Sequence, residues 1–341
     1  MKRLATSIAL AATVALAATA ARAETKILFS PFTPPGHVMF TGIVKPWAAD
    51  VERVTEGRVK ITYPANSLAP PPAQWEMVTN GIADAAFIFN GFAQKRLPLI
   101  TIAHLPFVTT TAEATSVALW RTYVKFFEKA DEYKGVHLLG LYTHPGNPLF
   151  SLDKPIVKVS QLDGLKVWAA PGPPAEAMGK LGAAVVSGPA VRMYEIVSKG
   201  TVDAFVGVPY ADVKNFKLVP YTKAATEVPG KLGGASFSMF MNEKTWSKIS
   251  KKDQEAITKV SGEMIARHAK SWDADDHVGL KEFLAAGGKQ VEAPAEFVAE
   301  LHQKLQFIED NWLKDAAKAG VDGKAALTFF RAEAKSLAGQ K

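Results

Sequence analysis

The stretch 159–209 alternates short apolar runs with helical patterns. The apolar runs predict three buried strands, at 165–169, 183–186 and 202–206, and the segments between them predict helices at 173–181 and 187–200. Two successive strand-helix-strand crossovers indicate a parallel sheet. Because ligands bind such sheets at the carboxyl ends of the strands, the loops after Trp168 and Val206 are the first places to look for a site.

The residues before this stretch show the same alternation. Strands are predicted at 26–29, 59–63, 83–89 and 136–142, and helices at 40–54, 73–80 and 112–129. This order is typical of an α/β lobe. The apolar run 234–241 matches these strands in pattern, so we expect the first lobe to be built from two separate pieces of the chain.

The segment 251–286 contains no proline and keeps helical spacing of its apolar residues. One helix of this length would extend about 50 Å, which is longer than one lobe. We therefore expect it to pass behind both lobes and to end at Gly287 and Gly288. A strand at 289–292 and an amphipathic helix through 297–312 are expected to close the second lobe.

The amino terminus has the pattern of a secretory signal peptide. Lys2 and Arg3 precede an apolar run, and Ala21, Arg22 and Ala23 offer a cleavage site with small residues at both ends. Cleavage there predicts a mature protein in the periplasm. We expect one lobe to comprise 24–146 plus 234–275, and the other 147–233 plus 276–341.

Composition narrows the possible functions. The precursor has 40 Lys and Arg against 33 Asp and Glu, and removal of residues 1–23 takes away three of the basic residues, leaving 37 minus 33, or +4. This mild charge, without a basic run, gives no reason to expect nucleic-acid binding. The chain has no cysteine, which excludes disulfides and thiolate chemistry. No catalytic, metal or cofactor motif stands out, so we expect neither an enzyme nor a bound cofactor.

Several phrases together resemble one family, the periplasmic solute-binding proteins of TRAP transporters. The residues that carry the resemblance are Leu162, Gly164, Leu165, Lys166 and Val167, then Leu181, Gly182 and Ala183, then Gly200, Val202 and Asp203, with further matching phrases at 78–87, 104–107 and 236–250. The resemblance implies a two-lobed α/β receptor, with a long helix across both lobes, that hands a small organic acid to a TRAP permease of two membrane subunits. We expect the receptor to be a monomer.

The chain departs from the family at one important position. Where the family usually carries an arginine that binds the ligand carboxylate, this chain has Trp168. An indole offers one hydrogen-bond donor and no charge. Either the acid is held by other residues, with Arg192, His144 and Asn147 as candidates, or the ligand is neutral and held by aromatic stacking. We favour an acidic ligand, because members of the family usually bind organic acids.

The candidate ligand-binding residues lie at strand exits and in the segments that connect the lobes. They are Phe32, His37, Trp75, Asn90, Phe92, His144, Asn147, Trp168, Arg192 and Tyr210. Aromatic side chains outnumber charged ones in this set. We therefore expect an organic acid with an apolar or aromatic body rather than a short dicarboxylate. A secreted enzyme is the least favoured alternative.

Overall fold

The computed structural model describes residues 24–339, so the predicted signal peptide lies outside the described residues. Its strands are β1 (Thr25–Leu28), β2 (Val59–Thr62), β3 (Ala85–Phe89), β4 (Val136–Thr143), β5 (Leu149–Ser151), β6 (Lys166–Ala169), β7 (Ala184–Ser187), β8 (Ala204–Val206), β9 (Ala224–Glu227), β10 (Ser236–Asn242) and β11 (Lys289–Glu292). They form three sheets of two, three and six strands.

The six-stranded sheet has the order β11-β9-β5-β8-β6-β7. Strand β6 pairs in parallel with β7 and with β8, and Trp168 lies opposite Val186 and Phe205. These are the three strands predicted from the apolar runs, and their parallel arrangement is confirmed. The carboxyl ends of β6 and β8 therefore open at the same edge of the sheet.

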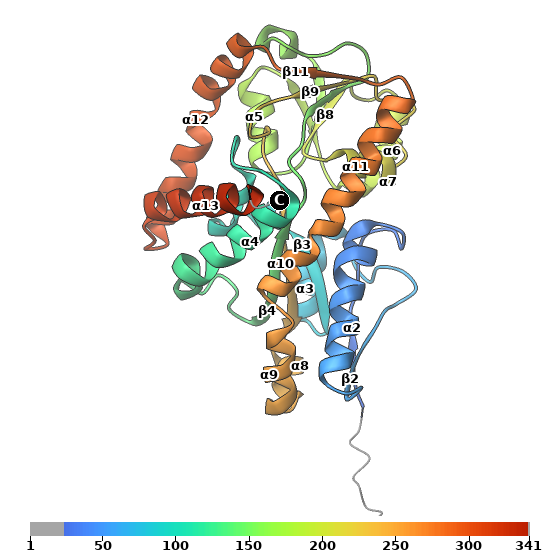
Figure 1. The fold of residues 1–341 in the computed structure, drawn as a ribbon, viewed down its shortest axis with the longest axis vertical. Helices are drawn as coiled ribbons and strands as arrows, with labels where there is room; N and C mark the ends of the chain where they lie inside the picture. Colours follow the sequence, from blue (N-terminus) through green and yellow to red (C-terminus); the bar gives the residue numbers. More distant parts are fainter. Residues whose placement is uncertain (1–23, 340–341) are drawn as a thin grey trace, which may run out of the picture.

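The other sheets come from the first part of the chain and from β10. Strand β10 lies between β3 and β4 and is antiparallel to both. Strands β1 and β2 form a parallel pair beside them, and Phe29 bridges to Ala85 of β3. In Figure 1 the three-stranded sheet and the β1–β2 pair lie in the lower half of the molecule and the six-stranded sheet in the upper half.

Helices surround the sheets (Figure 1). They are α2 (Lys45–Val54), α3 (Gln74–Thr79), α4 (Ala112–Thr122), α5 (Pro173–Lys180), α6 (Met193–Ser198), α7 (Tyr210–Asn215), α8 (Glu243–Lys248), α9 (Lys251–Lys259), α10 (Glu263–His268), α11 (Lys270–Ala285), α12 (Ala295–Lys318) and α13 (Gly323–Ala338). A π-helical turn at Met39–Val44, η1, precedes α2. Helix α13 packs against α4, and α12 packs against α5, so the C-terminal helices contact elements from both predicted lobes.

The single helix expected over 251–286 is divided into α9, α10 and α11, which corrects that prediction. At Gly262 the backbone has a φ of 58°, and its N–H donates to the carbonyl of Leu139 in β4 at 2.7 Å instead of continuing the helix. A Cβ there would lie 2.5 Å from the ring of Trp120. The part that reaches both halves of the molecule is α11, which contacts η1 and α4 as well as α7.

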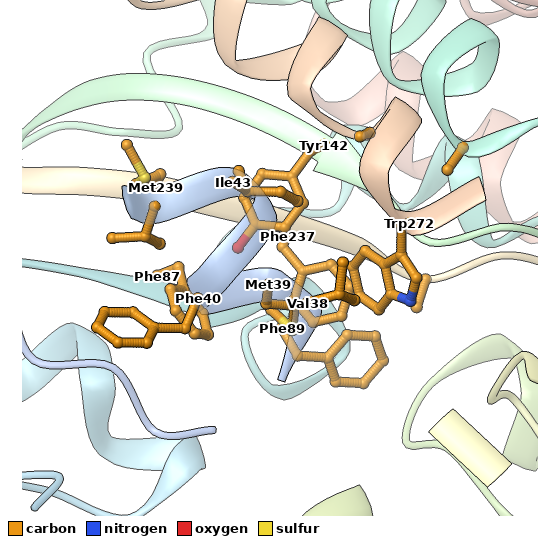
Figure 2. Packing of buried hydrophobic residues seen from close by; sticks show 14 of the residues in the cluster. Val38, Met39, Phe40, Ile43, Phe87, Phe89, Tyr142, Phe237, Met239 and Trp272 are labelled. Carbon is orange, nitrogen blue, oxygen red and sulfur yellow. The ribbon is translucent and has the colours of Figure 1, made fainter. Parts of the chain in front are cut away.

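Aromatic side chains fill the core between η1, the three-stranded sheet and α11 (Figure 2). Phe237 of β10 packs against Phe89, Tyr142 and Trp272, with ring centroids 5.4 to 5.6 Å apart. Trp272 is fully buried on α11. Because these rings come from four different elements, their packing holds those elements in fixed positions next to the cavity.

Candidate functional site

A cavity lies between the three-stranded and the six-stranded sheet. Its walls carry six phenylalanine and tryptophan side chains, which are Phe32, Phe89, Phe92, Trp168, Phe216 and Phe237. Among the described residues that line it, none is lysine or arginine. The lining of the cavity therefore suits an apolar or aromatic group.

One wall consists of the strand exits that the sequence indicated. Trp168 lies near the end of β6, and Gly207 and Val208 follow β8. Gly207 has a φ of 97°, and a Cβ there would lie 3.1 Å from the backbone nitrogen of Ala170. Glycine thus lets the two loops approach each other closely. The expectation that these two loops belong to one site matches the lining of the cavity.

The opposite wall comes from the three-stranded sheet and η1. Phe89 ends β3, Phe237 lies on β10 and Met39 begins η1, and all three line the cavity. Figure 2 shows their side chains in the cluster that also contains Trp272. Phe92 packs edge-to-face on Phe89, with ring centroids 5.2 Å apart. Aromatic side chains from both sheets therefore line the cavity.

The polar side chains of the cavity include His37, Thr33, Asp212 and His144. His37 follows β1 in the chain, Asp212 lies on α7, and the two meet with His37 Nε2 3.2 Å from Asp212 Oδ1. The backbone N–H of Met39 donates to His37 Nδ1 at 3.2 Å. Neither His37 Nε2 nor Asp212 Oδ1 has a hydrogen-bond partner, although both side chains are buried.

His144 lies in the segment that connects β4 to β5. Its Nδ1 contacts the carbonyl oxygen of Pro145, and its Nε2 lies 3.3 Å from the carbonyl oxygen of Gly207. Burial lowers the pKa of His144, because it disfavours the charged imidazolium, while Asp212 opposes this shift. A neutral imidazole carries one N–H, so His144 can donate a hydrogen bond to only one of these two carbonyl oxygens.

Two further residues of the cavity lining each have a buried polar atom without a hydrogen-bond partner. These atoms are the indole nitrogen of Trp168 and the hydroxyl of Thr33. Both can donate a hydrogen bond. Since buried polar groups in proteins are nearly always hydrogen-bonded, such unpaired donors mark positions where a bound molecule could place an acceptor.

Five of the ten candidate residues line the cavity together: Phe32, His37, Phe92, His144 and Trp168. Two others support it from behind. Asn90 is fully buried, donates to Ser236 Oγ at 2.9 Å and accepts from Ser238 Oγ at 2.7 Å. The Asn147 side chain lies between the carbonyl of Gly233 and the N–H of Gly207, and with its amide nitrogen turned toward Gly233 it donates at 2.9 Å and accepts from Gly207 at 3.2 Å.

The remaining three candidates lie elsewhere. Tyr210 donates to Glu227 at 2.8 Å and lies on a separate surface hollow. Trp75 is buried against Tyr133 and Phe240, with Arg96 over its ring. The side chain of Arg192 is 67% exposed and pairs with Glu195 at 3.0 Å, in a surface hollow beside the cavity.

Thr33, Phe89, Asp212, Phe216 and Phe237 line the cavity but were not singled out from the sequence. Thr33 was within reach of sequence reasoning, because it lies in the loop that contains Phe32 and His37. The position of Asp212 depends on how α7 packs against α11, which sequence periodicity does not reveal.

Within residues 24–339, no group of three or more metal-binding side chains comes together. No helix in the described part of the chain is both long and apolar enough to cross a bilayer.

The fold and the cavity between two sheets define a class, the two-lobed receptors that enclose a small solute between their lobes. A family model for bacterial extracellular solute-binding proteins, family 7, matches residues 29–315. The chain belongs to this family, which confirms the resemblance noted from the sequence.

Two known proteins are similar to this one over most of the chain. The chain is 44% identical over 308 residues to a Comamonas testosteroni protein named outer membrane transporter protein TsaT, with 90% of this chain and 91% of the relative covered. A TRAP periplasmic solute-binding protein from Bordetella bronchiseptica, solved with bound (R)- and (S)-mandelate, is 32% identical with a TM-score of 0.88, covering 92% of this chain and 99% of the other.

A second solved structure is similar over the same span. It is a TRAP solute-binding protein from Rhodoferax ferrireducens in complex with copurified benzoate, 28% identical with a TM-score of 0.83, covering 92% of this chain and 98% of the other. The two-lobed periplasmic binding fold expected from the sequence is confirmed, and the chain is a TRAP-type solute receptor.

Proposed function

We propose that this receptor binds an aromatic monocarboxylic acid in the cavity between its sheets. The observation that carries the proposal is the lining, to which both sheets contribute aromatic side chains and in which no lysine or arginine stands among the described residues. Burial of an aromatic ring contributes most of the binding free energy in such a site, and edge or offset contacts add about 0.5 to 1.5 kcal/mol. The mandelate and benzoate bound by the two solved relatives belong to the proposed ligand class.

The carboxylate would be held by neutral donors instead of an arginine. Trp168 Nε1 and Thr33 Oγ1 are buried without a hydrogen-bond partner, and both residues line the cavity. Arg192, the cation that the sequence suggested as a candidate, is mostly exposed and paired with Glu195. A carboxylate that accepts from an indole and a hydroxyl keeps its charge while its oxygens remain hydrogen-bonded.

A thermal-shift panel tests the ligand class directly. A ligand present at about one hundred times its dissociation constant adds roughly 2.7 kcal/mol to the free energy of unfolding. For a chain of this size each kcal/mol raises the midpoint by about 2 to 4 °C. We expect aromatic acids to shift the midpoint, and short dicarboxylates, sugars and amines to leave it unchanged. A panel in which only sugars or amines shift it would contradict the proposal.

The cavity also contains a feature that favours a neutral ligand, which is the carboxylate of Asp212. An anion close to it would be repelled unless other groups intervene. The comparison of each aromatic acid with its amide separates the two possibilities. Tighter binding of the amide would favour a neutral solute held by stacking.

We further propose that the receptor acts in the periplasm as a monomer and delivers its ligand unchanged to the two membrane subunits of a TRAP permease. The lobes are taken to be 24–146 plus 234–275 and 147–233 plus 276–341. Mass spectrometry of the ligand after prolonged incubation should recover it intact, and light scattering should give the mass of one chain. Reconstituted uptake should require both the receptor and the permease subunits. A chemically altered ligand would instead indicate a secreted enzyme.

A further inference from the structure

His37 and Asp212 place two complementary polar atoms side by side on the wall of the cavity. His37 Nε2 and Asp212 Oδ1 are within ion-pair distance of each other, at 3.2 Å, but no well-aligned hydrogen bond joins them and neither atom has another partner. The two residues are 2% and 5% exposed. A buried acceptor or donor without a partner destabilises the folded state. The arrangement therefore suits a ligand group that can pair with both atoms.

The chemistry of the two atoms is fixed by their surroundings. Because the N–H of Met39 donates to His37 Nδ1, the imidazole carries its hydrogen on Nε2. The ring is held between Phe216 and Trp272, at centroid distances of 5.4 and 5.9 Å. Asp212 lies in the first turn of α7, where a carboxylate is favoured. The pair thus presents one donor, on His37, beside one acceptor, on Asp212.

A hydroxyl group is the smallest group that satisfies both. An oxygen placed about 2.7 to 3.1 Å from each atom can accept from His37 Nε2 and donate to Asp212 Oδ1, since the two atoms are themselves 3.2 Å apart. We propose that His37 and Asp212 recognise a hydroxyl group on the ligand and so select hydroxy-substituted aromatic acids. This inference rests on the proposed function and deepens it.

A protonated carboxyl group could also donate to Asp212 and accept from His37. At neutral pH, however, a carboxylic acid with a pKa near 4 is protonated in only about one molecule in a thousand. Binding in that form would lose affinity by the same factor. A hydroxyl is present at full concentration. Thr33 and Trp168 then remain as donors for the ionised carboxylate.

Two ligand pairs that differ by one hydroxyl test the inference. Calorimetry of the full chain would compare mandelate with phenylacetate, and 3-hydroxybenzoate with benzoate. A hydrogen bond to a charged group predicts a preference of about tenfold or more for the hydroxylated member of at least one pair. In Asp212→Ala that preference should fall sharply, because the charged acceptor is gone and only the hydrogen bond from His37 remains. The exposed variant Asp310→Ala should retain it.

The outcomes separate this inference from the proposed function. Binding of none of the four acids would contradict the proposed function itself. Binding of the acids with no preference in either pair, or a preference that Asp212→Ala keeps, would overturn only the role of the His37–Asp212 pair. A preference that grows tenfold for each unit decrease in pH would indicate proton uptake and would also overturn it. If Asp212→Ala does not fold, the wild-type preference and its pH dependence still decide the question.

Discussion

Asp273 and Asp276 lie one turn apart on α11 and accept hydrogen bonds from the first turns of two different helices. Asp273 accepts from the N–H groups of Ala112 and Glu113 in α4, at 2.6 and 3.0 Å. Asp276 accepts from the N–H of Ala211 in α7 at 2.8 Å. Helix α4 packs on the three-stranded sheet, whereas α7 carries Asp212 of the cavity. Helix α11 thus fixes the position of α7 relative to the other half of the molecule.

Asp276 makes stability depend on pH. Burial raises the pKa of Asp276 to about 7, although the N–H of Ala211 opposes the shift. The folded state therefore binds this proton more tightly than the unfolded state does. From the unfolded value of 3.8 up to about 7, the free energy of unfolding should fall as pH rises, by on the order of 2 to 4 kcal/mol. Asp276→Asn keeps an acceptor for Ala211 and should remove this loss.

Urea denaturation of both proteins across that pH range checks the prediction. The difference in free energy of unfolding, variant minus wild type, should increase with pH. The exposed substitution Asp310→Asn controls for the removal of a carboxylate. Parallel curves for the wild type and Asp276→Asn would contradict the assignment. Glu132, whose pKa burial also raises to about 7, remains in both proteins and cancels in the difference.

Gly279 permits the close packing of α11 on α7. A Cβ at this position would lie 2.8 Å from the backbone nitrogen of Ala211 and closer still to the carbonyl of Tyr210. We therefore expect Gly279→Ala to destabilise the protein by about 1 to 3 kcal/mol and to weaken ligand binding by displacing α7. Gly179→Ala is a matched control on α5, where a Cβ would meet only Val185 at 4.0 Å. It should be neutral or slightly stabilising in a thermal melt. Equal midpoints for the two variants would refute the packing argument.

Substitution of Asn90, which follows strand β3, tests whether its side chain contacts the ligand or stabilises the fold. Its amide joins Ser236 and Ser238 of β10 in the buried interior. We expect Asn90→Ala to lower the free energy of unfolding by about 1 to 3 kcal/mol, because two hydroxyls lose a partner. Ligand affinity, measured by calorimetry well below the melting midpoint, should stay close to that of the wild type. A large loss of affinity with unchanged stability would instead support the direct ligand contact expected from the sequence.

The sequence predicted the parallel arrangement of β6, β7 and β8 because consecutive crossovers leave few alternatives. It therefore also indicated the loops after Trp168 and Val206. It could not reveal that Asn90 is satisfied by two serines about 146 residues later in the chain. Nor could it show that Gly262 interrupts the long helix, because the cause is the packing of Trp120 and a carbonyl of β4.

The position of Asp212 was beyond sequence reasoning for a related reason. Its side chain reaches the cavity only because Asp276 and Gly279 of α11 seat the short helix α7. Periodicity in six residues is too short to define a buried face. Site residues that are positioned by contacts between distant elements can thus be located only from the structure. The ends of strands within one sheet can be located from the sequence.

A substitution at Trp168 can distinguish the role of its indole N–H from the role of its aromatic ring. Trp168→Phe keeps an aromatic ring against the ligand but removes the unpaired Nε1–H. If that N–H holds the carboxylate, the variant should bind aromatic acids about tenfold more weakly, as expected for one hydrogen bond to a charged group. The corresponding neutral amides should lose less. Arg192→Ala should leave affinity and its salt dependence unchanged, because Arg192 is exposed and pairs with Glu195. Calorimetry of the wild type, Trp168→Phe and Arg192→Ala with an acid and its amide tests this prediction. A large loss of affinity in Arg192→Ala, with none in Trp168→Phe, would instead indicate that Arg192 binds the carboxylate.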